Sequence, residues 1–141
     1  MTNTDVVYHY TCSYLLPTII RSGFLTLTDS NFSFKQVDLY PVVWLTSSKT
    51  PDNHGILFDP QMPDDLNKTH IRFTIRKRPY IMQWDKWSDD KGMDKELKQT
   101  LIKSALAEDT YQQWYISEQP ISLATDVVCF ENLMTGQVCY F

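Results

Sequence analysis

A chain of 141 residues, of which 43% are hydrophobic and 13% aromatic, is long enough to bury a core, and it predicts one globular domain over residues 1–141. Its net charge of −4 disfavours a general nucleic-acid-binding surface, and no apolar run approaches the ~20 residues of a membrane-spanning helix. The polar start MTNTD lacks the form of a secretory signal, and three cysteines without CxxC spacing are typical of reduced thiols, so we expect a cytoplasmic protein.

The stretch VVYHYTCSYLLPTIIRSG, residues 6–23, predicts a strand followed by a short helix. Its first six residues alternate in the way that places His9 on one face of a strand. The helix that follows has an apolar stripe and ends at Gly23. A histidine on a strand just before a helix is well placed to face a pocket; the alternative is a structural histidine.

Further strands are predicted at residues 24–28, 41–48 and 70–78, and in the C-terminal segments QQWYIS, DVVCFEN and QVCYF. Residues 29–40 predict a loop that contains aromatic side chains. Trp84 and Trp87 are expected to pack as half-buried lids over the sheet. Residues 93–107 predict the second main helix. Several strands and two main helices without βαβ alternation favour an α+β fold with mainly antiparallel pairing.

Three elements carry residues that could meet in one cleft: His9, Trp44 with Ser47, and Glu118. Glu118 follows an apolar strand and precedes Pro120, where a carboxylate is accessible; the alternative is a plain surface glutamate. The histidines and cysteines are too scattered to predict a metal site. Four basic residues at 72–78 are interpreted as solvated strand ends, with local nucleic-acid contact as the alternative.

The segments YHYT, LLPTIIRSGFL, VVWLTSS and WYISEQPISL together resemble small bacterial and phage ADP-ribosyltransferase-like proteins. The likeness covers the first ~50 residues best and the last ~30 less well. It implies an ADP-ribosyltransferase-like split sheet, with NAD as substrate. It also implies catalytic roles for His9 and Glu118, and a NAD-binding set of His9, Tyr10, Thr11, Trp44, Ser47 and Arg72. The second position of the family's H-Y-E pattern, usually tyrosine, is Trp44 here, and the resemblance implies that its ring stacks on the nicotinamide.

The resemblance implies transfer of ADP-ribose to a macromolecular acceptor, with a protein favoured over a nucleic acid. Such a transfer builds positive charge on the ribose, which a nearby carboxylate stabilises. Pyrophosphate would need cationic or amide partners, for which Arg21, Arg72 and the first helix are candidates. An RNA phosphate-processing transferase that uses NAD is a related alternative, which the acidic balance disfavours. A third is a non-catalytic phage or defence-system protein that keeps the fold and binds or inhibits a protein partner.

Overall fold

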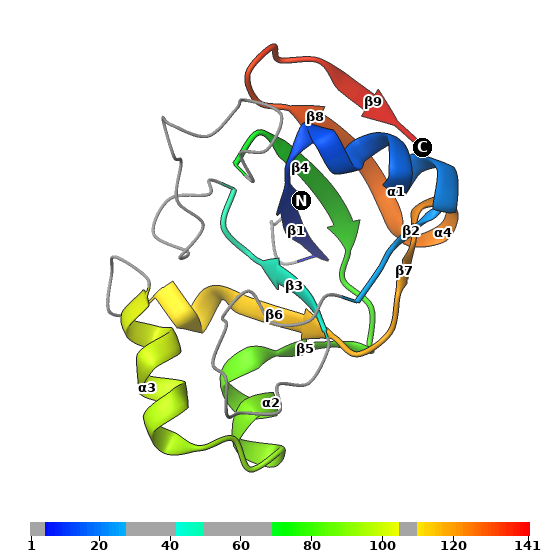
Figure 1. The fold of residues 1–141 in the computed structure, drawn as a ribbon. Coiled ribbons are helices and arrows are strands. Elements are labelled where there is room, and N and C mark those ends of the chain that lie inside the picture. The colour runs from blue at the N-terminus through cyan, green and yellow to red at the C-terminus, as the bar shows by residue number, and fades with distance from the viewer. Residues whose placement is uncertain (1–4, 28–41, 50–68, 105–109) are drawn as a thin grey trace.

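The computed structural model describes residues 5–27, 42–49, 69–104 and 110–141. They combine helices with a mostly antiparallel sheet, which confirms the α+β class expected from the sequence. The main sheet has seven strands in the order β5-β6-β3-β1-β4-β8-β9, and a two-stranded sheet pairs β2 with β7. Figure 1 shows α1 at the β8–β9 side of the main sheet and α2 and α3 at the β5–β6 side.

The elements have the following bounds. The strands of the main sheet are β1 Val6–Thr11, β3 Val43–Thr46, β4 Ile71–Arg76, β5 Ile81–Gln83, β6 Trp114–Ser117, β8 Val127–Asn132 and β9 Val138–Tyr140. The small sheet pairs β2 Phe24–Leu25 with β7 Ile121–Ser122. The helices are α1 Leu16–Ser22, α2 Trp84–Asp90, α3 Lys95–Ser104 and α4 Leu123–Asp126, and two 3₁₀ turns span Ser13–Leu15 and Thr110–Gln113.

The register of the main sheet divides its side chains between two faces. His9 pairs with Phe73 of β4, and Tyr8 pairs with Thr46 of β3. Side chains alternate along a strand, and residues opposite one another in register share a face. We call the face with the odd-numbered residues of β1 the His9 face, and the face with the even-numbered residues the Tyr8 face. Each residue of a paired strand can therefore be assigned to one of them.

The His9 face holds the larger apolar cluster, which packs against α1, the β2–β7 pair and α4. Its fully buried strand members include Val7, Val43, Ile71, Phe73 and Ile75. Helix α1 places Leu16 and Ile19 on this cluster and starts with Pro17 in its first turn. Gly23, at φ 77°, ends the helix and donates its N–H to Ile19 O at 3.0 Å, as the sequence predicts.

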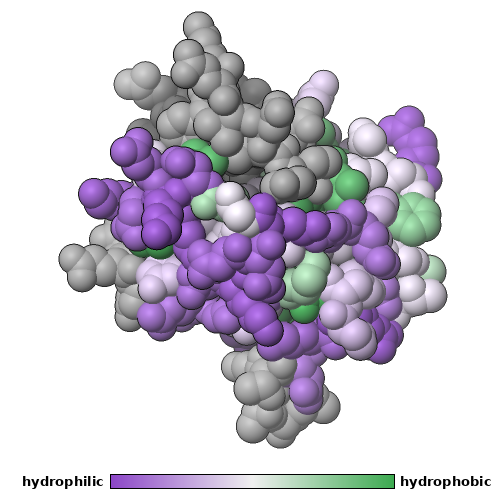
Figure 2. Space-filling model, turned by 90° about the horizontal axis from the view of Figure 1, so that it is seen from below, coloured by the Kyte–Doolittle hydropathy of each residue, from purple (hydrophilic) through white to green (hydrophobic). Residues whose placement is uncertain are grey.

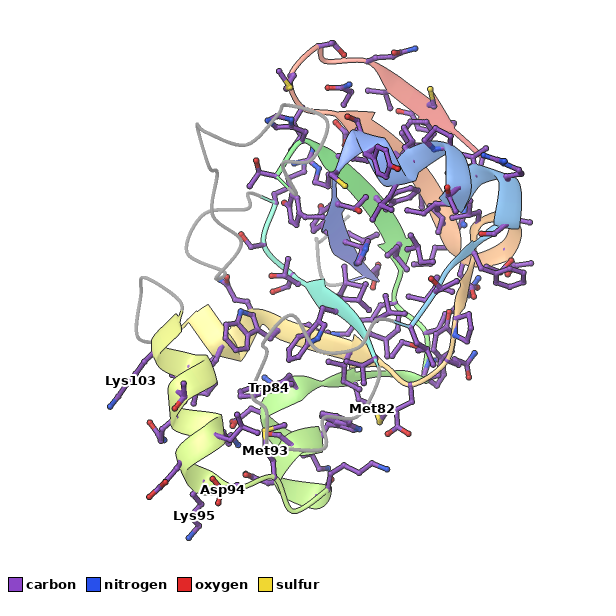
Figure 3. All side chains as sticks on the ribbon, in the orientation of Figure 1. Met82, Trp84, Met93, Asp94, Lys95 and Lys103 are labelled. Atoms are coloured by element: carbon purple, nitrogen blue, oxygen red, sulfur yellow. The ribbon has the colours of Figure 1, made fainter. Side chains whose placement is uncertain are left out.

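The Tyr8 face carries a cluster of tryptophans at the β5–β6 side of the sheet. Trp84 of α2 is fully buried, with its ring centroid 5.1 Å from Trp114 and 6.2 Å from Trp44. Lys98 Nζ ties α3 to α2 through ion pairs of 2.7 Å with Asp85 and Asp89. Figure 3 shows Trp84 and Met93 between the two helices and the sheet, whereas Lys95 and Lys103 point away from the protein.

Several expected elements differ from the structure. The tryptophans expected as half-buried lids belong to a helix, α2, and Trp84 and Trp87 are 0% and 4% exposed. The helix expected over residues 93–107 is α3, which begins at Lys95; residues 105–107 lie outside the described residues. The strand expected at 24–28 is only the two-residue β2. The aromatic loop of residues 29–40 also lies outside the described residues.

Candidate functional site

His9 is held in place from the neighbouring strand. Its ring packs beside Phe73, with centroids 6.5 Å apart, on the His9 face. Nδ1 donates a hydrogen bond of 2.7 Å to the carbonyl oxygen of Trp44 in β3. A carbonyl only accepts, so this bond places the proton of a neutral ring on Nδ1 and makes Nε2 the acceptor nitrogen. The sequence predicted that His9 lies on a strand. The structure confirms this and adds the bond to Trp44 that orients its ring.

The side chain of Trp44 lies on the opposite face of the sheet from His9. The register that pairs Tyr8 with Thr46 places Trp44 on the Tyr8 face. There its ring lies 6.1 Å from that of Trp114 within the tryptophan cluster. Only its main-chain oxygen reaches His9. The expectation that the indole of Trp44 stacks on a ligand beside His9 is therefore wrong, because the two side chains leave the sheet in opposite directions.

Glu118 also turns away from His9. Ser117, the last residue of β6, pairs with Val43 and so lies on the His9 face, and alternation directs Glu118 to the other side. Its carboxylate accepts a hydrogen bond of 2.6 Å from Trp87 Nε1 and lies 3.4 Å from Lys91 Nζ. The bond from Trp87, helped by Lys91, lowers the pKa of Glu118 below its usual value. Glu118 is thus bonded to Trp87 of α2 and to Lys91 just after it. The expected cleft of His9, Trp44 and Glu118 is not formed.

Arg72 and Tyr10 are a second correction, because they pair with each other on the Tyr8 face. Arg72 Nη2 donates to Glu131 Oε1 at 2.8 Å, Nη1 donates to the carbonyl of Lys49, and the guanidinium lies 5.5 Å from the centre of the Tyr8 ring. Burial works to lower the pKa of Arg72, but its bond and charge interaction with Glu131 raise it above the usual value.

The hydroxyl of Tyr10 donates to Ser48 O at 3.0 Å, beside this ion pair. Arg72 and Tyr10 therefore hold the chain that follows β3 against the Tyr8 face. The sequence had suggested that both bind a ligand beside His9, but they lie on the opposite face of the sheet.

Thr11 and Ser47 do share the His9 face. Thr11 is two residues beyond His9 on β1 and is buried. Ser47 follows β3, and its N–H donates to the carbonyl oxygen of Gln113 at 2.9 Å. This bond lies just past the end of the β3–β6 ladder at Thr46 and Trp114. Gln113 ends the 3₁₀ turn Thr110–Gln113, and the bond to its carbonyl places its main chain beside Ser47.

We call the polar residues assigned to this face, together with Gln113 beside Ser47, the His9 strip: His9, Thr11, Ser47, Gln113 and Tyr115. Apolar residues lie among them, with Leu45 of β3 between His9 and Tyr115. Lys77 adds a positive charge near it, with Nζ 3.3 Å from Tyr115 Oη and 4.5 Å from the centre of that ring. Gln113 was missed by sequence reasoning, since only its pairing with Ser47 reveals its position. Hydroxyl, amide and imidazole groups are the kinds of group that bind a polyhydroxylated ligand such as a ribose.

The remaining basic residues of the 72–78 cluster bind within the protein. Arg78 Nε pairs with Asp126 Oδ1 at 2.9 Å, and Asp126 Oδ2 accepts a bond of 2.6 Å from the hydroxyl of Tyr80. Burial works to raise the pKa of Asp126, but the bonds from Tyr80 and Arg78 outweigh it and lower the pKa below its usual value. Burial and the bond to Asp126 raise the pKa of Tyr80.

Two general features of the described residues bear on the kind of site. They include no group of three or more His, Cys, Asp or Glu side chains that could hold a metal ion. None of the helices formed by these residues is long and apolar enough to cross a membrane. Comparison of the chain with protein-family models, curated proteins and solved structures found no match in any of the three.

Proposed function

We propose that this chain is an ADP-ribosyltransferase-like protein that binds NAD at the His9 strip. The observation that carries the proposal is the position of His9 on the first strand, with its ring oriented by Trp44 O and hydroxyl residues on the same face. An imidazole can hydrogen-bond a ribose hydroxyl, and the hydroxyls of Thr11 and Ser47 can both donate and accept. The family resemblance of the first ~50 residues supports the same ligand.

We propose that the amide of Gln113, beside Ser47, fills the role that the resemblance gave to a carboxylate. Transfer breaks the bond between the nicotinamide nitrogen and the ribose carbon, nicotinamide leaves with the electron pair, and an acceptor then bonds to the ribose and gives up a proton. Positive charge builds on the ribose in this step. The amide of Gln113 can hold a ribose hydroxyl, but it brings no negative charge. We therefore propose that wild-type turnover is slow and that Glu118 does not contribute to it.

A second candidate function is binding without catalysis, as in a phage or defence-system protein that inhibits a protein partner. The specific observation that favours it is the separation of Glu118 from His9 by the sheet, together with the uncharged Gln113 on the His9 strip. The two candidates differ in whether NAD is consumed. They agree on the fold, so binding alone does not separate them.

The experiment is a nicotinamide-release assay with labelled NAD, run alone and with a cell lysate. Gln113→Glu adds a carboxylate to the His9 strip and should raise release about 10²-fold, the usual effect of one such electrostatic partner. Gln112→Glu is the matched control: it adds the same charge one residue away, where the carbonyl of Gln112 accepts a bond from Gln83. Equal rates for the two variants, or release that His9→Ala leaves unchanged, would contradict a catalytic His9 strip.

A further inference from the structure

Strand β9 is an edge strand with open hydrogen-bonding groups. It pairs with β8 in the register Phe130 with Cys139. Gln137 O accepts from Asn132 N–H at 2.9 Å, and Phe141 N–H donates to Val128 O at 3.1 Å, so odd-numbered residues direct their main-chain groups to β8. In an antiparallel ladder the residues between them direct theirs away. The N–H and C=O groups of Val138 and Tyr140 therefore point out from the sheet.

The side chains around this edge are apolar and exposed. The described residues include nine exposed large hydrophobic side chains, of which five lie in the last nine positions. They are Leu133, Met134, Val138, Tyr140 and Phe141. Segment 132–141 contains no charged residue and no proline, two of the devices that protect an edge strand from pairing. By contrast, Figure 2 shows that the end with α2 and α3 is mostly hydrophilic where its residues are described.

We propose that β9 pairs in an antiparallel manner with β9 of a second copy of this chain, about a two-fold axis at Cys139. In this register Val138 lies opposite Tyr140 of the second copy, and Tyr140 opposite its Val138. The outward groups of these residues then form four main-chain hydrogen bonds, none of which competes with β8. Val–Tyr pairs across strands are favourable, and the contact is self-complementary, as a two-fold interface requires.

The pattern of outward groups and the lack of charge on this edge both fit a second copy of the chain. A two-fold axis through the middle of Val138–Tyr140 satisfies all four outward groups of each strand with no residue left over. A different partner would ordinarily be selected by charge, and this edge carries none. The axis also brings Cys139 opposite its own copy at a non-hydrogen-bonded position, where Cα atoms are about 4.5 Å apart and within the range of a disulfide.

Sedimentation equilibrium over a concentration series tests the dimer. The mass should rise with concentration from 16.6 kDa to twice that value. Val138→Lys places a charge on the edge, and Tyr140→Pro removes an outward N–H without touching a bond to β8; both should remain monomeric. Gln99→Lys, on the exposed surface of α3, adds the same charge at the other end and should still dimerise. Circular dichroism of each variant checks that it is folded.

Cross-linking checks the register. Cys139 is partly exposed, whereas Cys12 and Cys129 are buried. Mild oxidation with diamide, which takes two electrons and two protons from a pair of thiols, should link Cys139 of two copies. Cys139→Ser and Val138→Lys should each abolish the link. A wild type that stays monomeric up to about 200 μM, or a dimer that both edge variants leave intact, would overturn the proposal.

Discussion

Replacing Arg72 with methionine should lower the free energy of unfolding by about 2–3 kcal/mol. The substitution keeps much of the apolar stem and removes the guanidinium that bonds Glu131 and the carbonyl of Lys49. It leaves Glu131 as an uncompensated charge on the Tyr8 face. The position is informative because the sequence had suggested that Arg72 binds a pyrophosphate, whereas the structure gives it partners within the protein.

The magnitude follows from how far the pair is buried. The side chain of Arg72 is 12% exposed and that of Glu131 26% exposed. Exposed pairs contribute about 0–1 kcal/mol, and breaking a fully buried pair costs about 3–5 kcal/mol, so this pair falls between the two. For a domain of this size, 2–3 kcal/mol corresponds to a fall in Tm of about 7–10 °C.

Urea unfolding and calorimetry measure the effect, with Arg76→Met as the matched control. Arg76 lies four residues along the same strand and on the same face, but it is exposed and only reaches carbonyl oxygens at 3.4 and 3.5 Å. Its replacement should cost less than about 0.5 kcal/mol. If the two variants lose equal stability, the structural role of Arg72 is refuted. A folded Arg72→Met protein that has lost NAD affinity would show that Arg72 binds the ligand.

Three further predictions rest on other contacts. Tyr80→Phe should cost about 2 kcal/mol, since the hydroxyl bonds a carboxylate. The pKa of Asp126 is lowered and that of Tyr80 is raised. The difference in unfolding free energy between wild type and Tyr80→Phe, measured with urea, should therefore be constant between about pH 5 and 9. It should shrink below about pH 4, as Asp126 is protonated, and above about pH 10, as Tyr80 of the unfolded wild type ionises. Glu118→Gln should leave NAD affinity unchanged by calorimetry, whereas a tenfold loss would contradict its place with α2. Gly23→Ala should cost about 1–2 kcal/mol in urea unfolding through its left-handed φ alone, since an added Cβ meets nothing within 4 Å; no loss would contradict that conformation.

Local patterns predicted the strands well. The alternation in residues 6–11 and 70–78 corresponds to β1 and β4, and the class that follows from many strands and few helices is confirmed. The helix α2 was missed although its signal is present: Trp84, Trp87 and Ser88 have the spacing of one helix face and are all buried. The run was assigned no helix, because the two tryptophans also suit half-buried lids over a sheet.

The candidate site could be predicted only in part, because it depends on how distant strands are aligned. Whether Trp44 shares a face with His9 is decided by the pairing of Tyr8 with Thr46. A shift of one residue in that register would move Trp44 to the face of His9, and no local pattern specifies the register. For the same reason Glu118 was chosen and Gln113 was not considered. A carboxylate is conspicuous in a sequence, whereas a glutamine gains meaning only once its carbonyl is found bonded to Ser47.

Calorimetric titration with NAD tests the central claim most directly, because it asks whether the His9 face binds the nucleotide. Wild-type protein should show saturable heat at millimolar NAD, and His9→Ala should weaken the affinity about tenfold, or 1.4 kcal/mol. Glu118→Gln, which alters the opposite side of the sheet, serves as the control and should bind as the wild type does. Absence of heat with the wild type, or equal affinity in the His9→Ala variant, would contradict the account.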